Sequence, residues 1–81
     1  MVGQIRDLDP AQCRMARAGL RMSRSTLAKA AGVSMATLAD FELGKRTPYA
    51  RTLRDIRRAL ELAGAEFVDG GARIVRGAEN E

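Results

Sequence analysis

The chain has 81 residues, with 14 Lys and Arg against 10 Asp and Glu, and a formal net charge of +4. This length fits one domain with a modest core. The single cysteine, Cys13, excludes an intrachain disulfide, and no uncharged stretch approaches the length of a membrane span. The absence of histidine excludes Ser-His and Cys-His catalytic pairs and metal sites built on imidazole. We therefore expect a soluble cytoplasmic protein that is not an enzyme and uses no cofactor, metal or membrane.

The positive charge is concentrated in residues 1–60, which hold 12 Lys and Arg against 5 Asp and Glu, whereas residues 61–81 hold 2 against 5. Twelve of the basic residues are Arg. The planar guanidinium of Arg matches phosphate groups and guanine edges bidentately. A solvated basic surface has the same composition, so the charge alone only suggests a nucleic-acid partner.

The first predicted helix begins near Pro10. Asp9, Pro10 and Gln12 have the spacing of an N-cap, a first-turn proline and a capping box. Cys13 lies on the apolar stripe of this helix. We therefore interpret Cys13 as a small core residue and not as a reactive thiol.

Two short helices are predicted next, each with a serine cap. Ser23 and Ser34 stand where an N-cap is expected, each between apolar residues that form a hydrophobic staple. Gly32 and Gly44 follow these helices and are expected to adopt the left-handed conformation.

A fourth helix is predicted from about Ala50 to Ala63, with Gly64 ending it. The hydrophobic period then changes to two, and residues 66–68 and 72–75 flank Asp69-Gly70-Gly71. This pattern predicts a β-hairpin. Its register stays open, because either Asp69-Gly70 or Gly70-Gly71 can form the turn.

The two central helices and the turn between them are the most informative part of the chain. Ala28 is small where the two helices cross closely, and Gly32 permits a positive φ in the turn. The apolar residues expected to fix the crossing angle are Leu27, Ala31, Val33, Leu38 and Phe41. A rigid pair of this kind lets its second helix enter a DNA major groove, which is about 12 Å wide.

The pattern resembles the lambda-repressor/Cro-like helix-turn-helix family, also called the xenobiotic-response-element family, over residues 10–63. The residues that carry the resemblance are Leu27-Ala28, Ala31-Gly32-Val33-Ser34, Thr37-Leu38, Phe41-Glu42 and Gly44-Lys45-Arg46-Thr47-Pro48. The resemblance implies a mainly α fold, a compact bundle of four or five helices, here followed by a C-terminal β-hairpin. We expect a helix-turn-helix DNA-binding domain in residues 1–63, a hairpin that serves dimerisation in 64–76, and a disordered acidic tail in 77–81.

The resemblance also implies roles for individual residues. Arg17 and Glu42 are expected to form a structural ion pair that fixes the third helix. The expected base contacts are Met35, Ala36, Thr37 and Asp40. Of these, Met35 and Ala36 can only meet thymine methyl groups, whereas Asp40 can accept from a cytosine amine. The expected phosphate contacts are Ser23, Arg24, Ser34, Lys45, Arg46, Thr47 and Arg51.

A dimer is expected because one small module makes a limited DNA interface, about 600–1,000 Å² of protein surface. Two copies related by a two-fold axis read half-sites about 34 Å apart. The apolar residues Phe67, Val68, Ile74 and Val75 of the hairpin are the candidate joint. The alternative is a hairpin that folds only onto its own domain.

The leading interpretation is a transcriptional repressor that binds a palindromic operator in double-stranded DNA as a homodimer. One alternative is a DNA-binding antitoxin, which also neutralises a toxin partner. Another is a protein-binding module that has lost DNA binding, since fold does not fix function. Met35, Ala36 and Asp40 keep this last alternative open, and the basic pair Lys45-Arg46 weighs against it.

Overall fold

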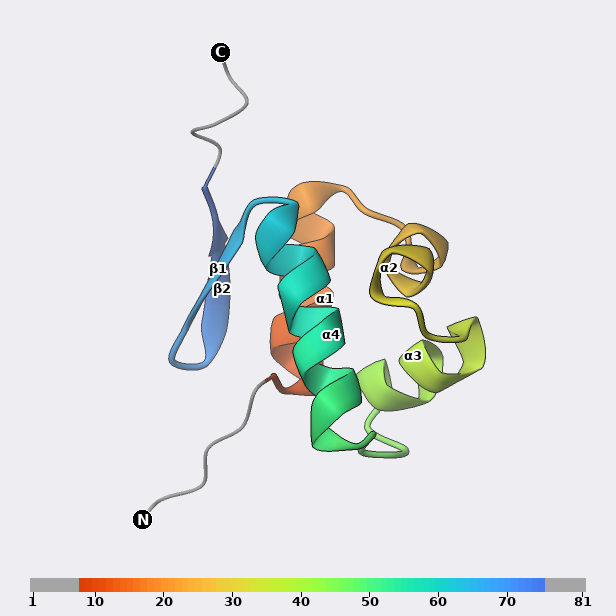
Figure 1. Cartoon of the computed structure of the whole chain (residues 1–81). Helices are drawn as coiled ribbons and strands as arrows, with labels where there is room; N and C mark the ends of the chain where they lie inside the picture. The colour runs from red at the N-terminus through yellow and green to blue at the C-terminus, as the bar shows by residue number, and fades with distance from the viewer. Residues whose placement is uncertain (1–7, 76–81) are drawn as a thin grey trace.

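A computed structural model describes residues 8–75 of the chain. In chain order its elements are α1 (Pro10–Leu20), α2 (Arg24–Ala31), α3 (Met35–Glu42), α4 (Ala50–Leu62), β1 (Ala65–Val68) and β2 (Gly71–Ile74). The expected mainly α fold with a C-terminal hairpin is confirmed (Figure 1). The acidic tail expected at residues 77–81 lies outside the described residues.

The helices begin where the sequence places their caps. The side chain of Asp9 accepts from the backbone N–H of Gln12 at 2.8 Å, and the Gln12 side chain accepts from the N–H of Asp9 at 3.1 Å. Ser23 and Ser34 cap α2 and α3 through their hydroxyl oxygens. Each cap satisfies a backbone donor that has no partner within its own helix.

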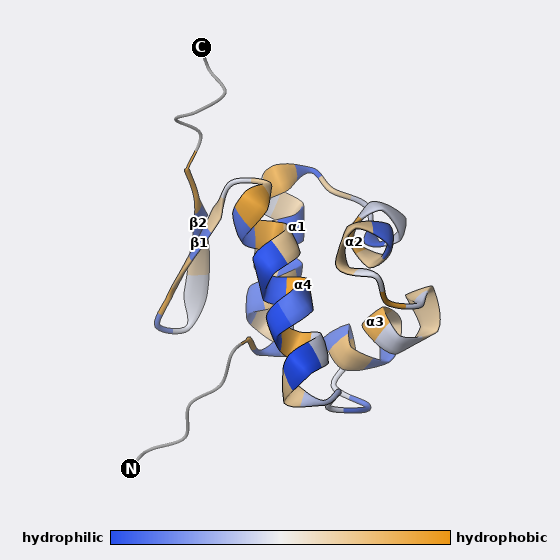
Figure 2. Cartoon of the chain, in the orientation of Figure 1, coloured by the Kyte–Doolittle hydropathy of each residue, from blue (hydrophilic) through white to orange (hydrophobic). Residues whose placement is uncertain are grey.

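The elements lie in three groups, with α1 and α4 in the middle, the hairpin on one flank and α2 with α3 on the other (Figure 1). Hydrophobic and hydrophilic segments alternate along α4, as in an amphipathic helix (Figure 2). The buried apolar residues form one core: Leu8, Cys13, Ala16, Leu27, Ala28, Leu38, Phe41, Leu53, Ile56, Ala59, Leu60 and Ala65.

The hairpin uses the first of the two registers left open by the sequence. Val68 pairs with Gly71, so Asp69 and Gly70 form the two-residue turn, and Gly70 has φ +72°. A two-residue turn favours residues that tolerate positive φ, and Gly does so without a Cβ clash. This register places Phe67 and Ile74 on the same face of the hairpin.

The hairpin packs on α1 as well as on α4. A Cβ at Gly19 would lie 2.7 Å from Cγ1 of Ile74, so the missing side chain lets β2 approach the helix closely. The Gln12 amide also donates to the carbonyl oxygens of Val68 and Gly71, at 2.9 and 3.2 Å. The same glutamine therefore completes a capping box and fixes the turn end of the hairpin.

Candidate nucleic-acid interface

The geometry of the α2–α3 pair depends on a tight turn. Gly32 has φ +73° and Val33 donates its N–H to the carbonyl of Ala28 at 3.0 Å, which closes α2. Ser34 then caps α3. Leu27 and Leu38 are both fully buried, so the two helices are held against a common core. The chain thus adopts the helix-turn-helix arrangement expected from its sequence.

The end of α3 is held by a buried polar cluster around Glu42, whose exposed fraction is 0%. Arg17 binds both carboxylate oxygens, with Nε to Oε2 and Nη2 to Oε1 each 2.8 Å apart. Arg24 donates Nε–H to Oε1 at 3.0 Å, and the Cys13 thiol donates to Oε2 at 3.1 Å. A buried carboxylate needs several donors such as these, because an unpaired charge in the core is strongly unfavourable.

Two further contacts extend this cluster to the backbone. The guanidinium of Arg14 donates to the backbone oxygen of Glu42 at the end of α3. Arg17 donates to the backbone oxygen of Met22, at 3.2 Å, in the segment that enters α2. The cluster therefore joins α1, the start of α2 and the end of α3 into one rigid unit.

The protonation states follow from these contacts. Burial by itself would raise the pKa of Glu42, but the hydrogen bonds from Arg17, Cys13 and Arg24 outweigh it and hold that pKa below its ordinary value. Burial raises the pKa of the Cys13 thiol, and its hydrogen bond to the carboxylate raises it further. The hydrogen bond to Glu42 raises the pKa of Arg17. At neutral pH the cluster holds a carboxylate, charged guanidinium groups and a neutral thiol.

Sequence reasoning expected the pair of Arg17 and Glu42, and the structure places these two residues in direct contact. The hydrogen bonds from Cys13 and Arg14 were not expected from the sequence, which suggested only a phosphate contact for Arg24. Cys13 lies 29 positions before Glu42 and Arg24 lies 18 before it. No local rule connects residues at such separations, so only the folded chain reveals the cluster.

The four residues expected to contact bases lie on α3 with different exposure. Met35 and Ala36 are exposed, and 49% of Met35 is accessible. Thr37 and Asp40 are half-buried. The hydroxyl of Ser34 donates to that of Thr37 at 3.0 Å while it accepts the Thr37 N–H, so the first turn of α3 is well ordered internally.

Of the residues expected to contact phosphate, Arg46 and Thr47 line a common hollow with Ser34 at the start of α3. Lys45, Arg46 and Thr47 are exposed in the loop after α3, and Arg51 is exposed in the first turn of α4. Ser23 is exposed at the start of α2 and its hydroxyl donates to Thr26 at 2.9 Å. The loop and the start of α3 enclose a hollow of about 410 Å³, lined by Val33, Ser34, Thr37, Arg46, Thr47, Pro48, Tyr49 and Thr52.

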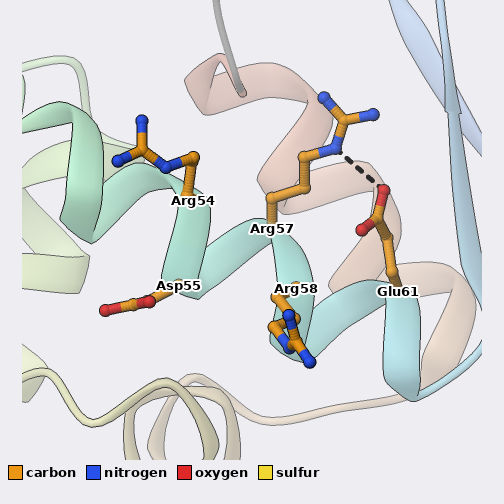
Figure 3. A pocket seen from close by; sticks show the side chains of 5 residues that line it. All are labelled: Arg54, Asp55, Arg57, Arg58 and Glu61. Atoms are coloured by element: carbon orange, nitrogen blue, oxygen red, sulfur yellow. Dashed lines mark hydrogen bonds and ion pairs between the residues drawn. The ribbon is translucent and has the colours of Figure 1, made fainter.

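A second hollow, of about 450 Å³, lies on α4 and is lined by Arg54, Asp55, Arg57, Arg58 and Glu61. Arg57 and Glu61 point toward each other there, whereas Arg54, Asp55 and Arg58 point in other directions, so the five side chains do not converge on one point (Figure 3). Arg57 donates to Glu61 at 2.8 Å and also lies 5.4 Å from the ring centroid of Phe67. This arrangement is that of a solvated helix face that includes the pair of Arg57 with Glu61, and not that of a binding site.

The residues expected at a dimer joint divide by face. Phe67 and Ile74 are half-buried and pack against the core of their own domain. Val68 and Val75 are exposed, with accessible fractions of 46% and 49%. Only these two are directed to solvent in the single chain.

Within residues 8–75, no group of three or more Cys, Asp and Glu side chains is placed to hold a metal ion. The longest helix of this range, α4, has 13 residues, and none of its helices could cross a bilayer.

Comparison with known proteins gives one family. The model described as "Helix-turn-helix" matches residues 14–67, which is two thirds of the chain. The match covers all of α2, α3 and α4, most of α1 and the first residues of the hairpin. A search among curated proteins finds no match. With this match and the α2–α3 geometry, the chain belongs to the lambda-repressor/Cro-like helix-turn-helix family of DNA-binding proteins.

Proposed function

We propose that this protein is a sequence-specific transcriptional regulator, a repressor, that binds an inverted-repeat operator as a homodimer. One observation carries the proposal: α3 exposes Met35 and Ala36 in its first turn while its C-terminal end is fixed by the buried Glu42 cluster. A recognition helix needs both properties, because a helix that moves relative to its support loses the register of its base contacts.

Phosphate contacts orient the helix in this proposal. Lys45 and Arg46 are exposed in the loop that follows α3, and the exposed Ser23 and Ser34 mark the starts of α2 and α3. Arg24 uses Nε for Glu42. A guanidinium carries five N–H donors, so the four on its Nη atoms are those we assign to a phosphate. With about four phosphates neutralised by each subunit, the dimer's log–log salt slope is about −7.

Base contacts in this proposal come from the exposed side of α3. Met35 and Ala36 meet thymine methyl groups, and Asp40 accepts from a cytosine amine while Thr37 adds a hydroxyl. Apolar contacts and one carboxylate give fewer directional hydrogen bonds than arginine or glutamine would. We therefore expect an operator with important A·T positions and one or two required G·C pairs in each half-site.

The dimer joint that we propose is the outer side of the hairpin, where Val68 and Val75 are exposed. A two-stranded hairpin has unpaired backbone groups on both edges, and such an edge readily pairs with another chain. Substitution of either valine by glutamate is expected to give monomers by analytical ultracentrifugation, because a buried unpaired carboxylate opposes association. These substitutions leave the contacts of Phe67 with its own domain in place.

The test of DNA binding is selection from a randomised duplex library followed by titration of the enriched sequence at two or more salt concentrations. The proposal expects an enriched inverted repeat and a saturable complex with a steep salt dependence. Arg46→Ala should weaken binding, whereas Arg58→Ala removes an equal charge from α4, away from α3, and should change it little.

One other function has a specific observation in its favour. Met35 is apolar and exposed at the start of α3, within the proposed reading surface, and apolar side chains of this kind also suit a protein partner. If the selection enriched no sequence and every duplex bound weakly, the result would favour binding of a protein partner over binding of DNA.

A further inference from the structure

Among the large hydrophobic side chains of residues 8–75, Tyr49 is the most exposed, with 87% of its surface accessible. It precedes α4 as its N-cap, with φ −60° and ψ 153°, and its side chain makes no capping hydrogen bond. Tyrosine combines a large apolar ring with a polar end, and for this reason it is enriched where proteins meet a ligand. Sequence reasoning did not assign Tyr49 any role.

Tyr49 is one of the residues that line the hollow between the start of α3 and the loop that follows this helix. Five of the eight residues around this hollow carry hydroxyl groups and one carries a guanidinium: Ser34, Thr37, Thr47, Tyr49, Thr52 and Arg46. The other two, Val33 and Pro48, are apolar. No carboxylate lines it, whereas Asp55 and Glu61 line the hollow on α4. Hydroxyl and guanidinium donors without a carboxylate suit a singly charged anion.

We infer that this hollow holds one phosphodiester of the DNA backbone and that Tyr49 closes it, with its hydroxyl on the phosphate and its ring against the deoxyribose. The inference rests on the proposed function and adds Tyr49 and Thr52 to the contact surface. Arg46 supplies the charge, and the hydroxyl groups of the threonines and Tyr49 supply further donors, since the Ser34 hydroxyl already donates to Thr37. The apolar walls face the sugar. The contact fixes the position of the backbone beside α3 and carries no sequence information of its own.

Two substitutions test the contact by binding. Tyr49→Ala should weaken binding about tenfold for each subunit, the effect of losing one hydrogen bond to a charged group. Thr52→Val keeps the shape and removes one hydroxyl, so a smaller loss is expected. Both losses should be equal on the selected operator and on a random 30-base-pair duplex, and the salt slope should stay unchanged because no cation is removed. Arg46→Ala should instead reduce the slope by about 1 for each subunit.

The matched control is Leu62→Ala, which truncates another exposed apolar side chain at the far end of α4. It should bind both duplexes like the unmodified protein. Circular dichroism and sedimentation of every variant show whether it remains folded and keeps its association state, so a change in binding can be assigned to the contact itself.

A second measurement does not depend on substitution. Tyr49 is the single tyrosine of the chain, so 3-fluorotyrosine labels one position and gives one ¹⁹F resonance. Addition of the random duplex at low salt should shift this resonance and protect it from solvent. An unmoved resonance, or Tyr49→Ala binding like the unmodified protein, would overturn this inference and leave the proposed function standing. Failure of the unmodified protein to bind any duplex would remove the proposed function as well.

Discussion

The helix-turn-helix end and the hairpin end of this molecule are held by different kinds of contact. At the first end, a buried carboxylate on α3 receives hydrogen bonds from α1 and α2, and every one of these bonds is directional. At the other end, Ile74 and Phe67 pack on α1 and the core through apolar surface, and the two hydrogen bonds from Gln12 reach only the exposed turn end of the hairpin. Apolar packing tolerates small shifts, whereas a carboxylate with fixed donors allows one position. The directional contacts of Glu42 therefore lie at the end of α3, the helix proposed to read DNA.

The largest loss of stability is expected on substitution of Glu42. Glu42→Ala leaves the guanidinium groups of Arg17 and Arg24 without their carboxylate, and removal of one member of a buried ion pair costs about 3–5 kcal/mol. Urea unfolding should show this loss. Glu42→Gln, which keeps the shape and part of the hydrogen bonding, should lose less and remain folded.

The control for this prediction is Glu61→Ala, since the pair of Glu61 with Arg57 is exposed. An exposed helix pair contributes at most about 1 kcal/mol. Equal losses at Glu42 and Glu61 would contradict the distinction between the two kinds of contact.

The hairpin end is tested at Gly19. A Cβ added there lies 2.7 Å from Cγ1 and 2.9 Å from Cδ1 of Ile74. Alanine favours the helix by about 1 kcal/mol over glycine, but overpacking costs about 1–3 kcal/mol. Gly19→Ala should therefore lower the free energy of unfolding, or at best leave it unchanged.

The same substitution in an Ile74→Ala background should become stabilising, because the clash is gone and the helix preference remains. A double-mutant cycle measures this reversal. Strict additivity of the two substitutions would show that β2 does not approach α1 as closely as described.

The pH dependence of stability measures the contribution of the buried Glu42 at the helix-turn-helix end. The pKa of Glu42 in the folded protein lies below its ordinary value near 4.5. The folded state therefore releases this proton more readily than the unfolded chain. Its contribution to stability is complete above pH 4.5 and is lost as the pH falls through the lower folded pKa.

Below pH 4.5 the unfolding free energy should decrease, with a maximum slope from this group of about 1.4 kcal/mol per pH unit. Glu42→Gln should remove that part of the slope. A variant with the same acid-limb slope as the unmodified protein would assign the pH dependence to other carboxylates.

Local rules predicted much of the fold, because helix caps and turns depend on neighbouring residues. Asp9, Ser23 and Ser34 cap the helices as expected, and Gly32 has the expected positive φ. The end of α1 had no such signal, since Arg21 takes the left-handed conformation, with φ 58°, where glycine is usual. The hairpin register also needed tertiary structure, because two glycines follow Asp69 and either turn was possible locally.

The candidate site was predicted only in part. Burial of Cys13 followed from the apolar stripe of α1, but its bond to Glu42 joins residues 29 positions apart. The resemblance to a family pointed to Arg17 and Glu42, whereas Arg24 entered the cluster only in three dimensions. Tyr49 had one usable signal, an aromatic residue directly after a basic loop. Its exposure was not predictable, because aromatic residues are more often buried.

The smallest expected effect is at the ion pair between the two strands of the hairpin. Glu66 and Arg73 pair directly across the strands, 2.7 Å apart, on the outer face of the hairpin, and both side chains are at least half exposed. A double-mutant cycle with alanine at both positions should give a coupling of about 0.5 kcal/mol or less, and the coupling should decrease with salt. Geometry alone does not set the strength of an ion pair, since the Glu42 pair has a similar distance of 2.8 Å. The two pairs differ in burial, and a coupling at Glu66 as large as the loss at Glu42 would show that burial is not what separates the two ends.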